Sequence, residues 1–361
     1  MKLSLPSFGS KSIVGLDVGS SSIKAVELST RGSGRDFDLT HLGVAQLPSE
    51  AIVQGAFLNA SAIIDSIREA VDRANIKTKN VAAAVSGHSV IVKKVSLPSM
   101  TREELDEQIR WEAEQYIPFD VNDVNIDFQI LSNGFESDGK MDVLLVAAKK
   151  ELINDYVNVI TEAGLRPAVI DVEAFAVETM FESNYRPGAE EVVALVNIGA
   201  SIVNINVVKN GLPAFTRDIS LGGNQYTEEI QKTLHVSFPE AESIKLGGTP
   251  ALSGKEILPE EVDQSMRGVS ETLSSEIQRS LEFFGATAPD DRVSRILLSG
   301  GCSQMSRLPE IIEEKTRIPV EISDPFKNIE CDPKLIDEDY LREVGPSVGV
   351  GVGLALRTAG A

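Results

Sequence analysis

Cysteine, histidine and long apolar runs are scarce in this chain of 361 residues. The two cysteines, Cys302 and Cys331, are too few for a disulfide scaffold and suit a reducing compartment. The three histidines lie far apart in the sequence, which argues against a histidine or cysteine metal site. The N-terminus lacks the apolar run of a signal peptide, and no stretch reaches the roughly 20 apolar residues that cross a bilayer. These absences predict a cytoplasmic protein.

Basic charge is also in short supply, with 34 Lys and Arg against 54 Asp and Glu and a net charge of −20. We find no basic patch, so the chain should repel nucleic acids and anionic membrane surfaces. Hydrophobic residues make up 42% of the chain, which is ordinary globular usage. At roughly 100 to 200 residues per domain, the length predicts two or three domains.

A pattern near the N-terminus recurs almost half the chain later. The segments 13–18 and 23–28 read as strands joined by the small-residue turn 19–22, and 192–198 and 202–209 are joined by Gly199-Ala200-Ser201. Aligning the two pairs sets Asp17 opposite Asn197. We therefore expect two similar lobes, each with a hairpin turn whose backbone N–H groups no bulky side chain shields.

Such a pair of turns could bind a polyphosphate, because unshielded backbone N–H groups donate to phosphate oxygens. Ser20, Ser21 and Ser22 add hydroxyl donors, Lys24 adds a cation, and Asp17 can accept hydrogen bonds from water on Mg²⁺. A single small-residue turn is more often only a hairpin, but the pair is more specific. Gly300-Gly301 follows the buried strand 296–299 and offers a place where a flat base could approach the backbone. The Rossmann and P-loop glycine patterns do not occur after the first strand.

Two further segments stand out. Thr101 and Glu104 form a capping box that opens a helix, and between Thr101 and Asp127 nine acidic residues face two basic ones. Strands follow at 126–131 and 141–148, so we interpret this region as an inserted subdomain. The glycine-rich stretch 344–356 has the spacing of a membrane-helix dimer motif, but a tightly packed helix of a soluble fold explains it better.

In order, these residues resemble the two phosphate hairpins and the adenosine motif of the actin/Hsp70/sugar-kinase superfamily. The segments GLDVGSSSIKAVEL, LPSMTREELDEQIRWEAEQYIPF and ILLSGGCSQMSRLPEII narrow the resemblance to the PilM family of type IV pilus assembly proteins, which is similar to FtsA. The resemblance implies an α/β, actin/Hsp70-like ATPase fold with two duplicated lobes around a nucleotide cleft. The expected units are lobe 1 (1–96), an FtsA/PilM-type inserted subdomain (97–165), an inter-lobe crossover (166–190), lobe 2 (191–340) and a C-terminal helix returning to lobe 1 (341–361).

The resemblance also implies a site for ATP or ADP with Mg²⁺. Asp17 and Asn197 fall at the metal positions, and Glu173 falls near the position where superfamily enzymes orient the attacking water. Glu173 could instead only cap the following helix, and Lys245 could lie on a solvated helix face. The implied nucleotide contacts are Asp17, Gly19, Ser20, Ser21, Ser22, Lys24, Gly199, Ala200, Ser201, Glu242, Lys245, Gly300 and Gly301.

Asn197 departs from the superfamily, which usually has aspartate there. The substitution removes a negative charge where phosphoryl transfer depends on electrostatics, so we expect ATP binding with at most slow hydrolysis. A nucleotide-dependent scaffold is therefore favoured. An active actin-like ATPase and an FtsA-like filament former remain alternatives, and the oligomeric state stays open.

PilM proteins bind the cytoplasmic N-terminal segment of the inner-membrane protein PilN, so the resemblance implies PilN and the pilus inner-membrane platform as partners. Membrane contact should then be indirect, since the C-terminus lacks the long basic amphipathic helix of FtsA. An extended peptide could meet apolar residues beside the acidic helix, although these could equally staple the insertion to its neighbour. The candidate contacts are Leu97, Pro98, Tyr116, Ile117, Pro118 and Phe119.

Overall fold

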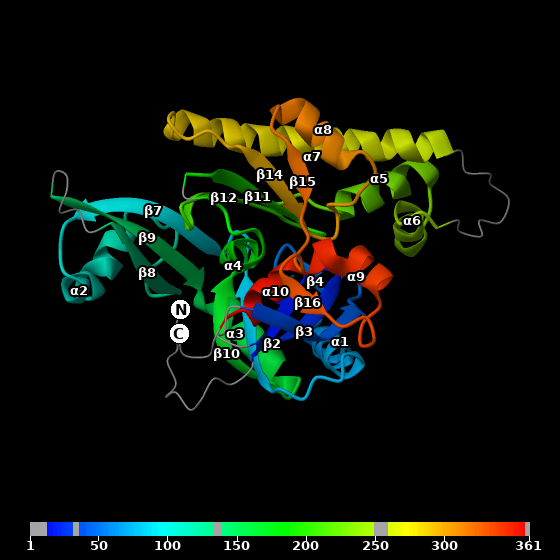
Figure 1. Ribbon diagram of the computed structural model, residues 1–361, viewed down its shortest axis with the longest axis horizontal. Helices are drawn as coiled ribbons and strands as arrows, with labels where there is room; N and C mark the ends of the chain where they lie inside the picture. Colours follow the sequence, from blue (N-terminus) through cyan, green and yellow to red (C-terminus); the bar gives the residue numbers. More distant parts are fainter. Residues whose placement is uncertain (1–12, 32–35, 133–138, 189, 249–258, 358–361) are drawn as a thin grey trace.

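The computed structural model describes residues 13–31, 36–132, 139–188, 190–248 and 259–357. Two larger β-sheets face each other across a layer of helices, and a smaller sheet projects to one side (Figure 1). Residues 1–12 and 358–361, which carry the predictions about a signal peptide and part of those about the C-terminal tail, lie outside the described residues. Within the described ranges, no helix has both the length and the apolarity needed to cross a bilayer.

The first sheet has the strand order β10-β6-β1-β2-β3-β16. Its strands are β1 (Val14–Val18), β2 (Ser22–Arg31), β3 (Asp36–Gln46), β6 (Asn80–Val85), β10 (Arg166–Val172) and β16 (Ile329–Cys331). β1 and β2 form the predicted antiparallel hairpin, and β6 runs parallel to β1. Helices α1 (Ala60–Arg73) and α3 (Lys150–Glu162) cover one face, because their apolar residues recur at helical spacing. The short hairpin β4 (Ile52–Val53) and β5 (Ala56–Phe57) precedes α1.

The second sheet repeats this plan with the order β13-β12-β11-β14-β15. Its strands are β11 (Val192–Ile198), β12 (Val203–Lys209), β13 (Leu212–Ile219), β14 (Arg295–Ser299) and β15 (Val320–Ile322). The helices of this lobe are α5 (Asn224–Leu234), α6 (Phe238–Lys245), α7 (Pro259–Thr287) and α8 (Leu308–Thr316). Every residue of β11 is buried, which is the pattern of a strand covered on both faces.

Two helices occupy the layer between the sheets. They are α4 (Glu173–Tyr185) and α10 (Gly349–Ala355), and α10 follows α9 (Glu338–Val344) and the 3-10 turn η1 (Gly345–Val348). One apolar cluster joins Val26 of the first sheet, Phe181 of α4 and Leu195 of the second sheet. A Cβ on Gly353 would lie 1.7 Å from the carbonyl oxygen of Ala176, so only glycine lets α10 approach α4 this closely. The predicted packed helix is thus confirmed, although its first turn is 3-10.

The chain returns to the first lobe earlier than predicted. Strand β16 pairs with β3, so the first sheet takes up the chain again at Ile329, before the expected boundary at 341. Just ahead of β16, the backbone N–H of Asn328 donates to Asn184 Oδ1 (3.0 Å), and Asn328 Nδ2 donates to the Asn184 carbonyl oxygen (2.6 Å). The chain crosses between the lobes twice, first through α4 and again just before β16. These bonds join the second crossing to the end of α4.

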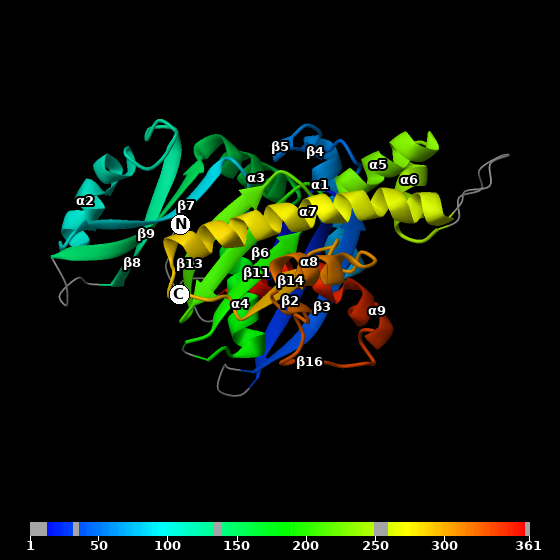
Figure 2. The same cartoon turned by 90° about the horizontal axis from the view of Figure 1, so that it is seen from above.

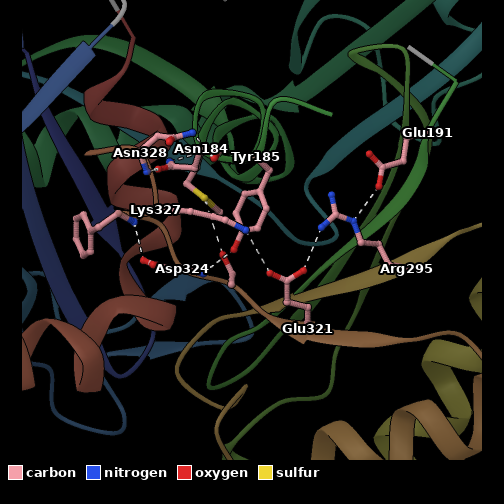
Figure 3. A network of polar contacts seen from close by, with 11 residues as sticks. Asn184, Tyr185, Glu191, Arg295, Glu321, Asp324, Lys327 and Asn328 are labelled. Atoms are coloured by element: carbon pink, nitrogen blue, oxygen red, sulfur yellow. Dashed lines mark hydrogen bonds and ion pairs between the residues drawn. The ribbon is translucent and has the colours of Figure 1, made fainter. Parts of the chain in front are cut away.

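Figure 3 shows the polar network around that junction. The Tyr185 ring lies beside two cations, with Lys327 Nζ 4.3 Å and Arg295 Cζ 5.7 Å from the ring centroid. The Tyr185 hydroxyl accepts a hydrogen bond from the Asp324 N–H (2.7 Å), and Arg295 forms ion pairs with Glu191 and Glu321. Both inter-lobe connections therefore meet at one corner of the second sheet.

The inserted subdomain is a three-stranded sheet with one helix. Its order is β7-β9-β8, with β7 (Val90–Pro98), β8 (Val124–Ser132), β9 (Lys140–Lys149) and α2 (Arg102–Ala113). The capping box is confirmed, since the Glu104 N–H donates to Thr101 Oγ1 (3.2 Å) and the Thr101 N–H donates to Glu104 Oε2 (2.8 Å). The sheet begins at Val90 rather than at residue 97. Helix α3, expected within the insertion, packs on the first sheet because its apolar stripe joins that core.

A buried polar contact lies between α4 and the second sheet. Asn206 Nδ2 donates to Glu178 Oε2 (2.9 Å) and also to the Ala174 carbonyl oxygen (3.3 Å). Glu178 is only 7% exposed, and this burial raises the pKa of its carboxyl group to about 7. The hydrogen bond from the Asn206 amide stabilises the charged form and partly opposes that rise.

This raised pKa predicts a pH-dependent stability. The folded protein holds the Glu178 proton up to about pH 7, whereas an unfolded glutamate ionises near 4.5, so raising the pH between these values favours unfolding. Glu178→Gln should therefore increase the free energy of unfolding by on the order of 2 kcal/mol at pH 8 and change it little at pH 4.5. Urea unfolding at both pH values measures this, with the exposed Glu314→Gln as control. An equal effect at both pH values would contradict it.

Candidate functional site

The two hairpin turns have the same backbone geometry. The Gly19 N–H donates to the Ser22 carbonyl oxygen (3.2 Å), and the Gly199 N–H donates to the Ile202 carbonyl oxygen (2.9 Å). Ser21 is exposed at the first turn, and Ala200 and Ser201 are half-buried at the second. Ser22 is buried, so its hydroxyl is less accessible than those of its neighbours. Each turn thus presents small residues at the end of a buried strand, as a phosphate-binding turn requires.

Asp17 and Lys24 face each other across the first hairpin. They are register partners on β1 and β2, and Lys24 Nζ lies 3.1 Å from Asp17 Oδ2. Both side chains are largely buried. Hydrogen-bonding to one carboxylate holds the ammonium group beside Gly19, whose Cβ position would lie 3.2 Å from Lys24 Nζ. The cation therefore sits at the turn itself.

Charges from both lobes act in one space. Burial raises the pKa of Cys302 to about 11, and the nearby cations Lys245, from lobe 2, and Lys24, from lobe 1, both oppose that shift. A Cβ on Gly87, from lobe 1, would lie 3.2 Å from Ile202 Cδ1, directly after the second turn. The two turns thus lie on either side of a shared region rather than on remote surfaces.

Glu173 is the first residue of α4 and lies in this region. Asn197 Nδ2 donates to Glu173 Oε1 (2.5 Å), and Ser86 donates a second hydrogen bond to the same carboxyl group. Burial first, and then the negative charge of Asp17, raise the pKa of Glu173 to about 7. The residue thus begins a helix, as the simpler interpretation held, and also contacts the end of β11 in the opposite lobe.

Asn197 links Glu173 to the third motif. It is 7% exposed, and its Oδ1 accepts a hydrogen bond from Ser299 Oγ (3.2 Å), the residue before Gly300. Gly300 has φ +92, and a Cβ there would lie 2.3 Å from the Ile198 carbonyl oxygen. Only glycine therefore fits between β14 and β11 at this point. Gly301 has no atom within 4 Å of its Cβ position and borders open space.

Lys245 and Glu242 lie on α6 at the same end of the region. Lys245 Nζ lies 2.6 Å from Glu242 Oε2 and donates to Thr227 Oγ1 (3.1 Å). The Lys245 side chain is only 6% exposed. The alternative prediction, that Lys245 lies on a solvated helix face, is therefore wrong. Its ammonium group lies 3.7 Å from the Cβ position of Gly223.

Sequence reasoning missed the residues that support the second turn. The Gly223 N–H donates to the Gly199 carbonyl oxygen (2.9 Å), and the Asn224 N–H donates to that of Ala200 (2.8 Å). A Cβ on Gly222 would lie 2.5 Å from the Gly199 carbonyl oxygen, so a side chain there would displace the turn. The signal was a Gly-Gly pair between a strand and a helix, which resembles an ordinary helix start.

The six candidate partner residues divide into two groups. Leu97 and Ile117 are buried in the apolar core that the inserted sheet shares with α2, so these two cannot contact a partner in this conformation. Pro98 and Pro118 are exposed, and Tyr116 and Phe119 are half-buried. Lys93 Nζ lies 5.3 Å from the Tyr116 ring centroid and Lys149 Nζ 4.8 Å from that of Phe119. Two of the chain's own lysines therefore flank these half-buried aromatic rings.

Two duplicated sheets, each with a hairpin turn directed at a shared region, define the actin-like ATPase fold. The ethanolamine utilization protein EutJ from Carboxydothermus hydrogenoformans shares it, with a TM-score of 0.57, 15% identity, and coverage of 98% of this chain and 90% of that one. The family described as type IV pilus assembly protein PilM matches residues 15–359, and the chain belongs to that family. It is an actin-like protein of type IV pilus assembly.

The solved PilM-PilN type IV pilus biogenesis complex contains a chain with the same architecture. The TM-score is 0.85 at 28% identity, covering 96% of this chain and 98% of that chain. Cell division protein FtsA from Neisseria meningitidis serogroup B is 26% identical over 353 residues, which cover 86% of this chain and 83% of FtsA. FtsA from Bacillus subtilis is 25% identical over 257 residues, and the match spans 64% of this chain and 57% of that protein.

The Asn197 contact leads to a prediction. Asparagine donates to the Glu173 carboxyl group, whereas the aspartate of Asn197→Asp would bring a second carboxylate to within about the same distance. The free energy of unfolding should fall by about 1–3 kcal/mol at pH 8 and by less at pH 5, where one carboxyl group takes up a proton. Denaturant unfolding at the two pH values, without nucleotide or metal, measures this. The exposed Asn122→Asp is the control, and a pH-independent loss would exclude carboxylate repulsion.

Proposed function

We propose that the protein is an ATP-binding scaffold of the type IV pilus assembly machinery that binds the N-terminal segment of PilN. It would work in the cytoplasm, held at the inner membrane through that partner, and support pilus biogenesis and twitching motility. The observation that carries the proposal is that two equivalent hairpin turns, one of them beside the Lys24 cation, adjoin the contacts of Asn197 with Glu173 and of Ile202 with Gly87, in a chain of the PilM family.

In this proposal the phosphates lie between the two turns. The Gly19 and Gly199 N–H groups close the turns, so the backbone N–H groups of Ser20, Ser21, Ala200 and Ser201 are the ones that donate to phosphate oxygens. Lys24 supplies a cation. Gly301 borders open space that leaves room for the base, while Gly300 lets β14 approach β11, and Glu242 with Lys245 borders the ribose. Because Lys24 already pairs with Asp17, a phosphate would share or take over an ammonium group that is held in position.

The residues present also suit Mg²⁺ bound together with a nucleotide. Mg²⁺ usually keeps several waters and binds through one or two carboxylates plus substrate phosphates, and Asp17 supplies such a carboxylate. When bound, the ion would neutralise phosphate charge. Among the residues described, no group of three His, Cys, Asp or Glu side chains could hold a metal by protein ligands alone. Asn197 contributes no charge, and its amide is already bonded at both ends.

Slow hydrolysis follows from the same contacts. A carboxyl group with a pKa near 7 can accept a proton from water, so Glu173 is a chemically reasonable general base. However, transition-state stabilisation in phosphoryl transfer relies on charge placement, and one carboxylate usual at this site is replaced by an amide. The protein is therefore proposed to bind ATP and to hydrolyse it well below the roughly 1 to 100 turnovers per second of kinases.

The partner surface is proposed on the inserted subdomain. Pro98, Pro118 and the half-buried rings of Tyr116 and Phe119 offer apolar contact, and the exposed acidic face of α2 lies in the same subdomain. Glu103 and Glu107 are exposed and form no ion pair within the part of the chain that the structure describes. Trp111, the single tryptophan, is 73% exposed on this helix and was not among the expected residues. Basic residues of a partner peptide would be attracted to this face.

Lys24→Ala tests the nucleotide site. Loss of the cation should weaken ATP binding about tenfold or more, which is about 1.4 kcal/mol, because a charge-assisted hydrogen bond to phosphate disappears. Titration calorimetry with Mg²⁺-ATP measures the dissociation constant, and the exposed Lys77→Ala is the matched control. A phosphate-release assay on the unchanged protein gives the turnover. Unaltered ATP affinity in Lys24→Ala would argue against this phosphate site.

Reversing charges on α2 tests the partner surface. The double variant Glu103→Lys/Glu107→Lys should slow association of a labelled PilN N-terminal peptide at least fivefold at low salt, with a smaller change in dissociation. Glu104 is left unchanged because it closes the capping box. The control is Glu310→Lys/Glu314→Lys, which makes the same charge change at the same spacing on α8. Stopped-flow kinetics with equal rates for both variants would remove α2 from the binding surface.

A further inference from the structure

Four residues lie between the candidate nucleotide site and the inserted subdomain. Strand β6 ends at Val85 in the first sheet, and β7 begins at Val90 as the first strand of the inserted sheet. The residues between them, Ser86 to Ser89, are named the connector here. The inserted sheet lies at one end of the molecule and helices α5 and α6 lie at the other, so the connector is placed where the subdomain joins the lobes (Figures 1 and 2).

One side of the connector contacts the candidate site. Ser86 hydrogen-bonds to the Glu173 carboxyl group. Gly87 has φ +87, and a Cβ placed on it would lie 3.2 Å from Cδ1 of Ile202, the residue that closes the second turn. The Gly87 N–H also donates to Asp218 Oδ2 (2.5 Å), and His88 Nε2 lies 2.6 Å from Ser220 Oγ, at the end of β13. The connector thus contacts α4, the second turn and the end of β13.

The other side of the connector contacts the inserted subdomain. The Lys149 N–H, at the end of β9, donates to the Ser89 carbonyl oxygen (3.0 Å), so the entry and the exit of the insertion are bonded together. The Lys149 ammonium group in turn lies over the Phe119 ring. A continuous set of contacts therefore runs from Ile202 through Gly87 and Ser89 to Phe119.

We propose that the connector couples the two ligands: a nucleotide that displaces the second turn shifts Gly87 and His88, and with them the base of the subdomain that binds the partner peptide. This inference rests on the proposed function and describes how nucleotide binding would regulate peptide binding. The connector would follow such a displacement because the Gly87 N–H is bonded to Asp218 and the His88 ring to Ser220, both of which belong to the lobe that carries the second turn. A contact path by itself does not establish coupling, so the decisive quantity is the change in one affinity caused by the other ligand.

The experiment measures that quantity directly. The dissociation constant of a labelled PilN N-terminal peptide is determined with and without saturating Mg²⁺ and a non-hydrolysable ATP analogue, and the analogue affinity is determined with and without peptide. Fluorescence anisotropy and calorimetry provide the two readouts. The unchanged protein should show an affinity change of at least fivefold, equal in both directions.

Three variants test the connector. His88→Ala, Ser220→Ala and Gly87→Ala should each reduce the coupling factor at least threefold while each separate affinity stays within about twofold. The first two remove the same contact, so their double variant should show no further loss. The matched control is His235→Asn, which changes an exposed histidine at the left-handed end of α5 to a residue that tolerates this conformation.

The outcomes separate the two proposals. If the unchanged protein binds neither analogue nor peptide, the proposed function is wrong and the connector's role falls with it. If it binds both independently, or if all three variants retain full coupling, the function stands and the connector inference is overturned. A variant that loses the affinity for one ligand alone would place the connector inside that binding site, which also overturns the inference.

Discussion

The burial of α4 and α10 between two sheets is the constraint on which this structure depends. Each large sheet has one apolar face covered by its own lobe's helices and another that these two helices cover together. Removing water from both inner faces requires both sheets to meet the same helical layer. The ends of β1 and β11, and therefore the two hairpin turns, are consequently held at opposite sides of one space.

Polar contacts lie along this apolar layer. Asn197 donates to Glu173, Asn206 donates to Glu178, and Asn204 donates to Asp218. In each case an amide meets a carboxyl group whose pKa burial raises. Such pairs contribute less to stability than apolar packing, but an unpaired partner would be costly. The first two pairs join α4 to the second sheet and so specify how that helix is aligned, whereas Asn204 and Asp218 are neighbours within the second sheet. The corner around Tyr185 joins both chain connections.

The inserted subdomain is attached differently. It has its own core, which contains Leu97, Leu105 and Ile117. Its base lies beside the connector, and there Val90 and Ala148 join the apolar core of the first lobe. An element that has its own core and is joined to the lobes only at its base can shift as a unit when that base moves. This arrangement supports the proposal that a nucleotide between the lobes and a peptide on the insertion influence each other through a short segment.

Local patterns determined much of the architecture. Alternating apolar runs identified the two hairpins, the capping box at Thr101 located α2, and Gly164 and Asn210-Gly211 adopt the positive φ angles that their residue types favour. These features depend on neighbours in sequence, so a single chain reveals them. The repeat of the hairpins also indicated two lobes, and the family likeness supplied an order of motifs.

Contacts between distant residues were decided only in the folded chain. No pattern indicates that Lys245 is buried against Thr227, that α3 packs on the first sheet, or that Leu97 and Ile117 face inward. Gly222 and Gly223 look like an ordinary helix start until the second turn is seen against them. The reason is physical: hydrophobicity and backbone preference act over a few residues, whereas burial, pKa and shared cavities depend on which remote segments the sheets bring together.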